Sequence, residues 1–147
     1  MRSLLTAGFA LAMLTPQAFA EGDAAKGEKA FNKCKACHMI KTADGDTIVK
    51  GGKTGPNLWG VVGRTAGTED FKYSKYVIAA GEAGLVWDEE QFIAYVADPS
   101  KYLKTYLDDS KARAKMTFRL KKAEEAADVW AYLESVSPAV EGDDSGS

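Results

Sequence analysis

The run Cys34-Lys35-Ala36-Cys37-His38 constrains the fold of this chain more than any other feature. Residues three positions apart on a helical turn face the same side, so both thiols can reach one ligand. A Cys-x-x-Cys-His run is the attachment signature of a c-type haem, whose two vinyl groups bond the two sulfurs. The tether would hold the His38 imidazole near the iron at a high effective concentration. Both cysteines and the single histidine of the chain lie in this run.

Two other chemistries use a Cys-x-x-Cys pair, and each fits this chain less well. Zinc normally takes four ligands from Cys, His and carboxylates, whereas this run offers three Cys and His side chains that are too close together to complete a tetrahedron. A thioredoxin-like dithiol lies near a βαβ unit, and no βαβ pattern surrounds the run. Haem attachment is the favoured interpretation, and a dithiol oxidoreductase is the main alternative.

Residues 1–20 have the pattern of a secretory signal peptide. Arg2 gives a positive start, residues 4–14 form an apolar run, and residues 18–20 are Ala-Phe-Ala, which is a typical cleavage site. The apolar run is too short to cross the ~30 Å of hydrocarbon in a bilayer, which argues against a membrane anchor. We therefore expect a soluble periplasmic protein that begins at Glu21 and has no membrane span. Export agrees with the motif, because c-type haem is attached outside the cytoplasm.

The chain after the signal peptide has the length of one domain with a modest core, which a haem would enlarge. We assign residues 21–136 to this domain. Residues 137–147 are rich in Ser, Gly, Pro and Asp, and we expect them to form a disordered acidic tail.

Charged residues are segregated along the chain. Basic residues dominate 26–53, with seven lysines against three acids, and 101–122, with eight Lys or Arg against two acids. Acids dominate 69–98, with seven against two lysines, and 124–147, with seven and no Lys or Arg. Without Arg2, 18 basic residues stand against 21 acidic ones, a net charge of −3 before haem is added. We expect a molecule with a charge dipole.

Capping residues and hydrophobic spacing predict an all-α fold with long loops. The expected helices are 23–34 with an Asp23 N-cap, 74–80, a helix that starts after the Asp88 cap and stops before Pro99, 100–107, and about 121–136. Residues 39–68 are rich in Gly, Thr and Lys and are expected to be a loop. A large apolar prosthetic group can organise loops of this length, which a bare core of this size could not.

The ligand on the other side of the iron can be inferred largely by elimination. A second histidine ligand is impossible, because His38 is the only histidine. The methionines after residue 20 are Met39, which adjoins His38 and cannot reach the opposite face of the ring, and Met116, whose loop can. A lysine or an open site remains as the alternative. Iron with His and Met ligands has a raised reduction potential and no free position for a substrate, which favours electron transfer over catalysis.

The two basic segments surround the candidate ligands His38 and Met116. We expect their lysines to ring an exposed haem edge and to steer an acidic partner surface to the place where the electron leaves. Because such contacts must be brief, we expect a small and salt-sensitive interface.

The chain also resembles the class I c-type cytochromes, and specifically the bacterial cytochrome c2 and c-550 group close to mitochondrial cytochrome c. The similarity covers about residues 22–136. The motifs that carry it, in family order, are Cys34-Lys35-Ala36-Cys37-His38, Thr54-Gly55-Pro56-Asn57-Leu58, Gly63-Arg64, Trp87 and Lys115-Met116.

The resemblance implies the class I cytochrome c fold, in which helices and long loops wrap around one haem c bound covalently through Cys34 and Cys37. It implies that the Pro56 carbonyl accepts a hydrogen bond from His38 Nδ1–H and that Tyr95 donates to the Met116 sulfur. The residues implied to hold the inner haem propionate are Arg64, Tyr73 and Trp87. The candidate cofactor-binding residues are thus Cys34, Cys37, His38, Pro56, Arg64, Tyr73, Trp87, Tyr95 and Met116, with His38 and Met116 as iron ligands.

The resemblance also implies that the first and last helices cross. Gly27 and Phe31 would meet Val129 and Tyr132 there, with Gly27 allowing a close approach.

The chain departs from the group at three places. Residues 101–114 are longer than in the mitochondrial form, and Trp59 takes a position more often held by Tyr or His. Ala114 stands where many relatives have a threonine that helps to secure the methionine loop. We therefore expect that loop to lack one hydrogen bond and to be looser.

Together these inferences predict a monomeric one-electron carrier that is not an enzyme and has no nucleic-acid partner. The resemblance implies a cytochrome bc complex as electron donor, and a photosynthetic reaction centre, a terminal oxidase or a denitrification enzyme as acceptor. The competing hypothesis is a haem enzyme or gas sensor, such as a peroxidase, whose sixth position is open or labile.

Overall fold

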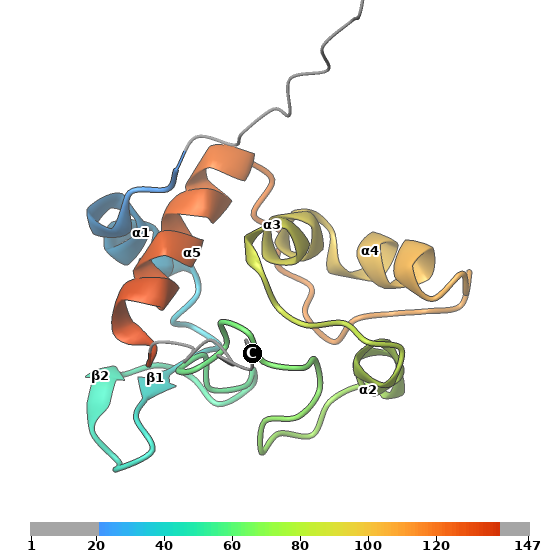
Figure 1. Cartoon of the computed structure of the whole chain (residues 1–147), viewed down its shortest axis with the longest axis horizontal. Helices are drawn as coiled ribbons and strands as arrows, with labels where there is room; N and C mark the ends of the chain where they lie inside the picture. The colour runs from blue at the N-terminus through green and yellow to red at the C-terminus, as the bar shows by residue number, and fades with distance from the viewer. Residues whose placement is uncertain (1–20, 139–147) are drawn as a thin grey trace, which may run out of the picture.

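The computed structural model describes residues 21–138. The expected signal peptide, residues 1–20, and residues 139–147 of the expected acidic tail lie outside this part of the chain. The described elements, shown in Figure 1, are α1 (Ala24–Ala30), the 3₁₀ turn η1 (Phe31–Lys33), β1 (Ile40–Lys41), β2 (Thr47–Val49), α2 (Lys75–Glu82), α3 (Glu89–Ala97), α4 (Pro99–Tyr106) and α5 (Ala123–Val136).

The prediction of a helical chain with long loops is confirmed, and each expected helix is present. The expectation of a loop over residues 39–68 is wrong at residues 40–41 and 47–49, where β1 and β2 form a hairpin. Its strands pair antiparallel, with Ile40 opposite Val49, and Gly45 has a φ of 98° between them. Strands of two and three residues are too short to show an alternating pattern in the sequence.

Side-chain caps explain where four of the helices begin. Asp23, Ser74, Asp88 and Asp98 each accept a backbone N–H from the first turn of the helix that follows. Asp98 separates α3 from α4, and Pro99 follows it at the first position of α4, where a proline costs no hydrogen bond. These caps are local signals, which is why the sequence predicts these helix starts closely.

Two clusters of buried side chains form the core. The first joins α1, α3 and α5 around Phe31, Phe92, Trp130 and Leu133. The second lies at α2, α4 and the segments that flank them, around Val77, Ala80, Leu85, Leu103 and Ala112. In Figure 1, α1 crosses α5 on one side of the molecule and α2 lies near α4 on the other. Trp87 and Tyr95 contact both clusters.

The crossing of α1 and α5 confirms the arrangement that the family resemblance implies. A Cβ atom on Gly27 would lie 1.8 Å from the Asp128 carbonyl oxygen and 2.8 Å from Tyr132 Cβ, so only glycine fits. The rings of Phe31 and Tyr132 pack with centroids 5.7 Å apart, and Val129 is fully buried in the same cluster.

Replacing Gly27 with alanine is therefore expected to destabilise the protein by about 3 kcal/mol, because a methyl group would push two helix backbones apart. Guanidinium unfolding of the holoprotein, followed by circular dichroism, measures this change. Glu28→Ala, at an exposed position of the same helix, is the control and should stay within about 0.5 kcal/mol of the parent. Equal stabilities of the two variants would contradict the close crossing.

In the described part of the chain, none of the helices combines the length and the apolar character that a membrane crossing requires.

Candidate functional site

A cavity of about 380 Å³ lies between the helices and the long loops. Apolar side chains from the first core cluster, among them Val61, Phe92, Val96 and Val129, form much of its wall. The volume falls within the range of about 300–1,000 Å³ that is typical of cofactor pockets. The structure brings to this one cavity all the candidate residues, which are Cys34, Cys37, His38, Pro56, Arg64, Tyr73, Trp87, Tyr95 and Met116.

The Cys-x-x-Cys-His run forms a tight turn at the end of the first helical segment. The Cys34 carbonyl accepts the N–H groups of Cys37, at 3.1 Å, and of His38, at 3.0 Å. This turn makes the two thiols and the imidazole line the same cavity. Cys34 is half-buried and Cys37 is exposed.

A glycine-rich loop packs against the back of this turn. The N–H of Gly52 donates to the Lys35 carbonyl at 2.9 Å, and the N–H of Gly55 donates to the Cys37 carbonyl at 2.8 Å. A Cβ atom on Gly55 would lie only 2.4 Å from Cε1 of the His38 ring. The loop can therefore lie flat against the imidazole and fix its position.

The His38 ring is also fixed by a hydrogen bond. Its Nδ1 lies 2.8 Å from the Pro56 carbonyl oxygen. A carbonyl can only accept, so Nδ1 carries the proton and Nε2 keeps the lone pair that a metal would bind. Burial lowers the pKa of His38, which keeps the ring neutral.

Arg64 presents a fixed positive charge at the cavity wall. Its guanidinium donates to the carbonyls of Asn57, at 3.1 Å, and of Trp59. The same group forms an ion pair with Glu69 at 3.2 Å, and only 12% of the Arg64 side chain is exposed. Sequence reasoning did not identify Glu69, which gives no motif signal and approaches Arg64 only in the folded chain.

Three aromatic side chains bring polar hydrogens to the cavity. Trp87 and Tyr95 pack edge to face with ring centroids 5.0 Å apart. Burial raises the pKa of Tyr95. Burial also raises the pKa of Tyr73, although Arg64 acts in the opposite direction. Both phenols therefore remain protonated at neutral pH and can donate a hydrogen bond.

Met116 enters the cavity from the segment between α4 and α5, residues 107–122, which we call the Met116 loop. Its side chain is half-buried and packs against the first core cluster. The neighbouring Lys115 donates from Nζ to the Lys72 carbonyl, which ties the loop to the segment before α2. Met39, the other methionine of the described chain, does not line the cavity.

The Cys34 thiol lacks the electrostatic environment of a reactive thiol. Burial, with a smaller contribution from Glu125, raises the pKa of Cys34 to about 11. Reactive thiols have pKa values near or below neutrality, because the thiolate is the nucleophile. Among residues 21–138, no group of three or more His, Cys, Asp or Glu side chains is arranged to hold a metal ion.

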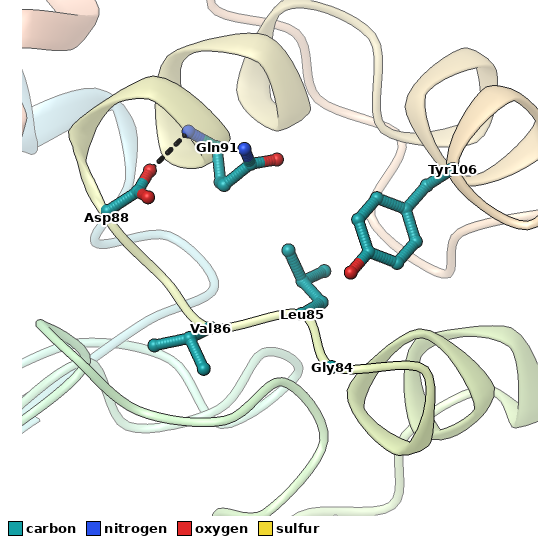
Figure 2. A pocket seen from close by; sticks show the side chains of 6 residues that line it. All are labelled: Gly84, Leu85, Val86, Asp88, Gln91 and Tyr106. Carbon is teal, nitrogen blue, oxygen red and sulfur yellow. Dashed lines mark hydrogen bonds between the residues drawn. The ribbon is translucent and has the colours of Figure 1, made fainter.

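A second cavity, of about 190 Å³, contains none of the candidate residues (Figure 2). The residues that line it are Gly84, Leu85, Val86, Asp88, Gln91 and Tyr106. The dashed line in Figure 2 marks the N–H of Gln91 donating to the Asp88 cap at 2.8 Å. The Gln91 side chain accepts a hydrogen bond from the Tyr102 hydroxyl. It therefore holds α4 against α3.

Some cavity residues were not predicted from the sequence. Leu58, Val61, Val77, Leu120 and Val129 line the cavity, but each looks like an ordinary core residue in the sequence. Gly55 lies in one of the motifs of the family resemblance, and its contact with the His38 ring became visible only in the structure.

Comparison with known proteins gives a consistent result. A family model described as Cytochrome c matches residues 24–137. Cytochrome c2 of Rhodobacter capsulatus is 57% identical over 91% of this chain and 96% of its own length. Cytochrome c-550 of Paracoccus denitrificans is 50% identical over 91% of this chain and 87% of its own length. The crystal structure of cytochrome c2 from Rhodobacter sphaeroides superposes with a TM-score of 0.78, at 56% identity, over 80% of this chain and 98% of that one.

Proposed function

Because the chain belongs to the cytochrome c family and has its class I fold, we propose that it is a soluble periplasmic one-electron carrier of the cytochrome c2 type. The proposal rests on one observation, which is the set of chemical groups that line a single cavity. Both thiols and the imidazole of the Cys-x-x-Cys-His run line the same cavity as the Met116 thioether. Few chemistries other than haem c use this set of groups together.

The residues of the cavity fit a haem c. A bound haem would supply an iron that alternates between the ferric and ferrous states. Cys34 and Cys37 would hold it covalently, and His38 would ligate through Nε2, since Nδ1–H is committed to Pro56. Met116 would be the second protein ligand of the iron, through its thioether sulfur. The soft thioether favours the ferrous state and so raises the reduction potential.

Three of the other candidate residues, Arg64, Tyr73 and Trp87, would hold the inner haem propionate. A buried carboxylate is costly unless it is paired and hydrogen-bonded. Arg64 is held at the cavity wall by the carbonyls of Asn57 and Trp59, so its charge is in place before any ligand arrives. Tyr73 and Trp87 can add neutral donors beside it.

Ligation from both sides would leave no open position on the iron, which favours electron transfer over catalysis. The test is spectroscopic and electrochemical. The exported protein should contain one covalently bound haem, show the far-red charge-transfer band of a ferric iron–thioether bond, and titrate as a single one-electron couple. A ferrous form that binds carbon monoxide tightly at neutral pH, together with absence of the far-red band, would instead support the haem enzyme or gas sensor.

We also propose that electron donors and acceptors dock where the cavity meets the surface. The exposed Cys37 and the exposed lysines Lys35 and Lys53 lie in or beside the segments that line the cavity. A cytochrome bc complex would be the donor, and a photosynthetic reaction centre, a terminal oxidase or a denitrification enzyme would be the acceptor. Positive charge at this edge would attract an acidic partner and raise the association rate.

Charge reversal at Lys35 and Lys53 tests this docking proposal. We expect Lys35→Glu/Lys53→Glu to slow electron exchange with a bacterial cytochrome bc complex about tenfold at ~0.01 M salt, with little effect at high salt. Stopped-flow kinetics over a salt series measure both effects. Lys26→Glu/Lys29→Glu is the control, because it changes the net charge equally on α1, outside the cavity lining. Equal slowing by both pairs would show that net charge, not local docking, governs the rate.

A further inference from the structure

The first turn of α4 holds the Met116 loop on the N-terminal side of Met116. The N–H of Ala114 donates to the Ser100 hydroxyl at 3.1 Å. Ser100 is the second residue of α4, and the Asp98 cap and Pro99 before it fix the start of that helix. The hydroxyl therefore belongs to a helix whose start is fixed. It bonds a loop residue that lies two positions before Met116.

The junction of α3 and α4 also holds the C-terminal side of the loop. The N–H of Leu120 donates to the Val96 carbonyl at 2.8 Å. Arg119 lies 3.2 Å from the Asp98 carboxylate. Together with the Ser100 bond, these contacts fix the loop at positions before and after Met116.

The contacts differ in their expected strength. The Arg119 side chain is 50% exposed, and exposed ion pairs contribute little. The Ser100 bond is partly buried, and Ala114 packs against the second core cluster, which contains the fully buried Leu103 and Ala112. Loss of the hydroxyl would leave the Ala114 N–H without its partner at a partly buried position, which costs stability. Residue 114 is alanine, so its own side chain has no oxygen that could form a hydrogen bond. The Ser100 hydroxyl provides an oxygen at this position from outside the loop.

We propose that Ser100 is a positioning residue that keeps the Met116 loop closed and so protects the sixth coordination position from external ligands. This inference rests on the proposed function, in which Met116 ligates the iron. It assigns to the first turn of α4 a role in controlling access to the iron. The bond uses the backbone of Ala114 and is made from outside the loop, so it does not depend on the side chain at position 114.

Imidazole binding to the ferric holoprotein tests the proposal, since imidazole can bind only when the Met116 loop opens. We expect Ser100→Ala to raise the apparent imidazole affinity about fivefold, through a larger fraction of open loop. The rate of binding at saturating imidazole, which is the rate of loop opening, should rise as well. Ser100→Thr keeps the hydroxyl and should restore both values to near those of the parent.

Ser135→Ala is the matched control. Among residues 21–138, the Ser135 hydroxyl bonds the Tyr132 carbonyl of its own helix, α5, so its loss should leave imidazole binding unchanged. A Ser100→Ala protein with the imidazole affinity and opening rate of the parent would overturn the proposal. If Ser100→Ala fails to mature, amide hydrogen exchange in the ferrous parent protein decides instead. Protection of the Ala114 amide supports the bond, and rapid exchange contradicts it.

The parent protein separates this inference from the proposed function. If the parent lacks the far-red band and binds imidazole as tightly as Met116→Ala, Met116 is not the ligand and the proposed function fails. If the parent and Ser100→Ala both show the far-red band and bind imidazole equally weakly, the proposed function stands and only the proposed role of Ser100 is wrong.

Discussion

Met116→Ala is expected to remove the far-red band of the ferric protein and to open the sixth position, so that the ferrous form binds carbon monoxide. Met116 is the methionine of the described chain that lines the cavity with His38, and alanine has no atom that can ligate iron. Loss of the thioether should also lower the reduction potential, by on the order of 0.2 V within the ~0.8 V range that axial ligands control. Absorption spectra, carbon monoxide titration and a redox titration measure these changes.

Met39→Leu is the matched control for this experiment. Met39 adjoins His38 but does not line the cavity, and leucine keeps its volume. This variant should retain the spectrum, the potential and the resistance to carbon monoxide. If Met116→Ala kept the parent spectrum, a lysine or another group would have to be the sixth ligand, and the proposed carrier function would lose its main support.

Local signals in the sequence predicted the helices well. Asp23, Ser74 and Asp88 are caps whose hydrogen bonds reach only two or three residues along the chain, so the pattern of residue types is enough to locate them. The hairpin of β1 and β2 has no such signal. It is held partly by Asn57, whose side chain bonds both the N–H and the carbonyl of Lys41, and this contact spans a loop.

The sequence predicted those candidate site residues whose residue type is rare in the chain. It did not predict the contacts that depend on how distant segments pack together. His38 and Met116 stood out because the chain offers few alternatives. The contacts of Gly55 with the His38 ring and of Ser100 with Ala114 join segments that no sequence spacing relates. Long-range contacts of this kind depend on the fold as a whole, so a single sequence does not specify them.

The double variant Cys34→Ser/Cys37→Ser, which cannot attach haem, is expected to have no cooperative unfolding transition. A packed interior without haem would have to contain the cavity of about 380 Å³ as a void. At about 24 cal/mol per Å³ for an enclosed cavity, such a void would cost at most about 9 kcal/mol, which is comparable with the whole stability of a typical domain, about 5–15 kcal/mol. Circular dichroism during guanidinium unfolding, with mass spectrometry to verify the absence of haem, measures the outcome.

Lys35→Ser/Ala36→Ser controls for the serine substitutions themselves. Both residues are exposed and lie between the two cysteines, so this variant should keep its haem and unfold cooperatively. The comparison isolates the thioether bonds, because the two variants place the same number of serines in the same five-residue run. A haem-free double-cysteine variant with a sharp, native-like unfolding transition would show that the protein fills the cavity with its own side chains. In that case the long loops would be organised by the polypeptide, and the prosthetic group would contribute chemistry without contributing the core.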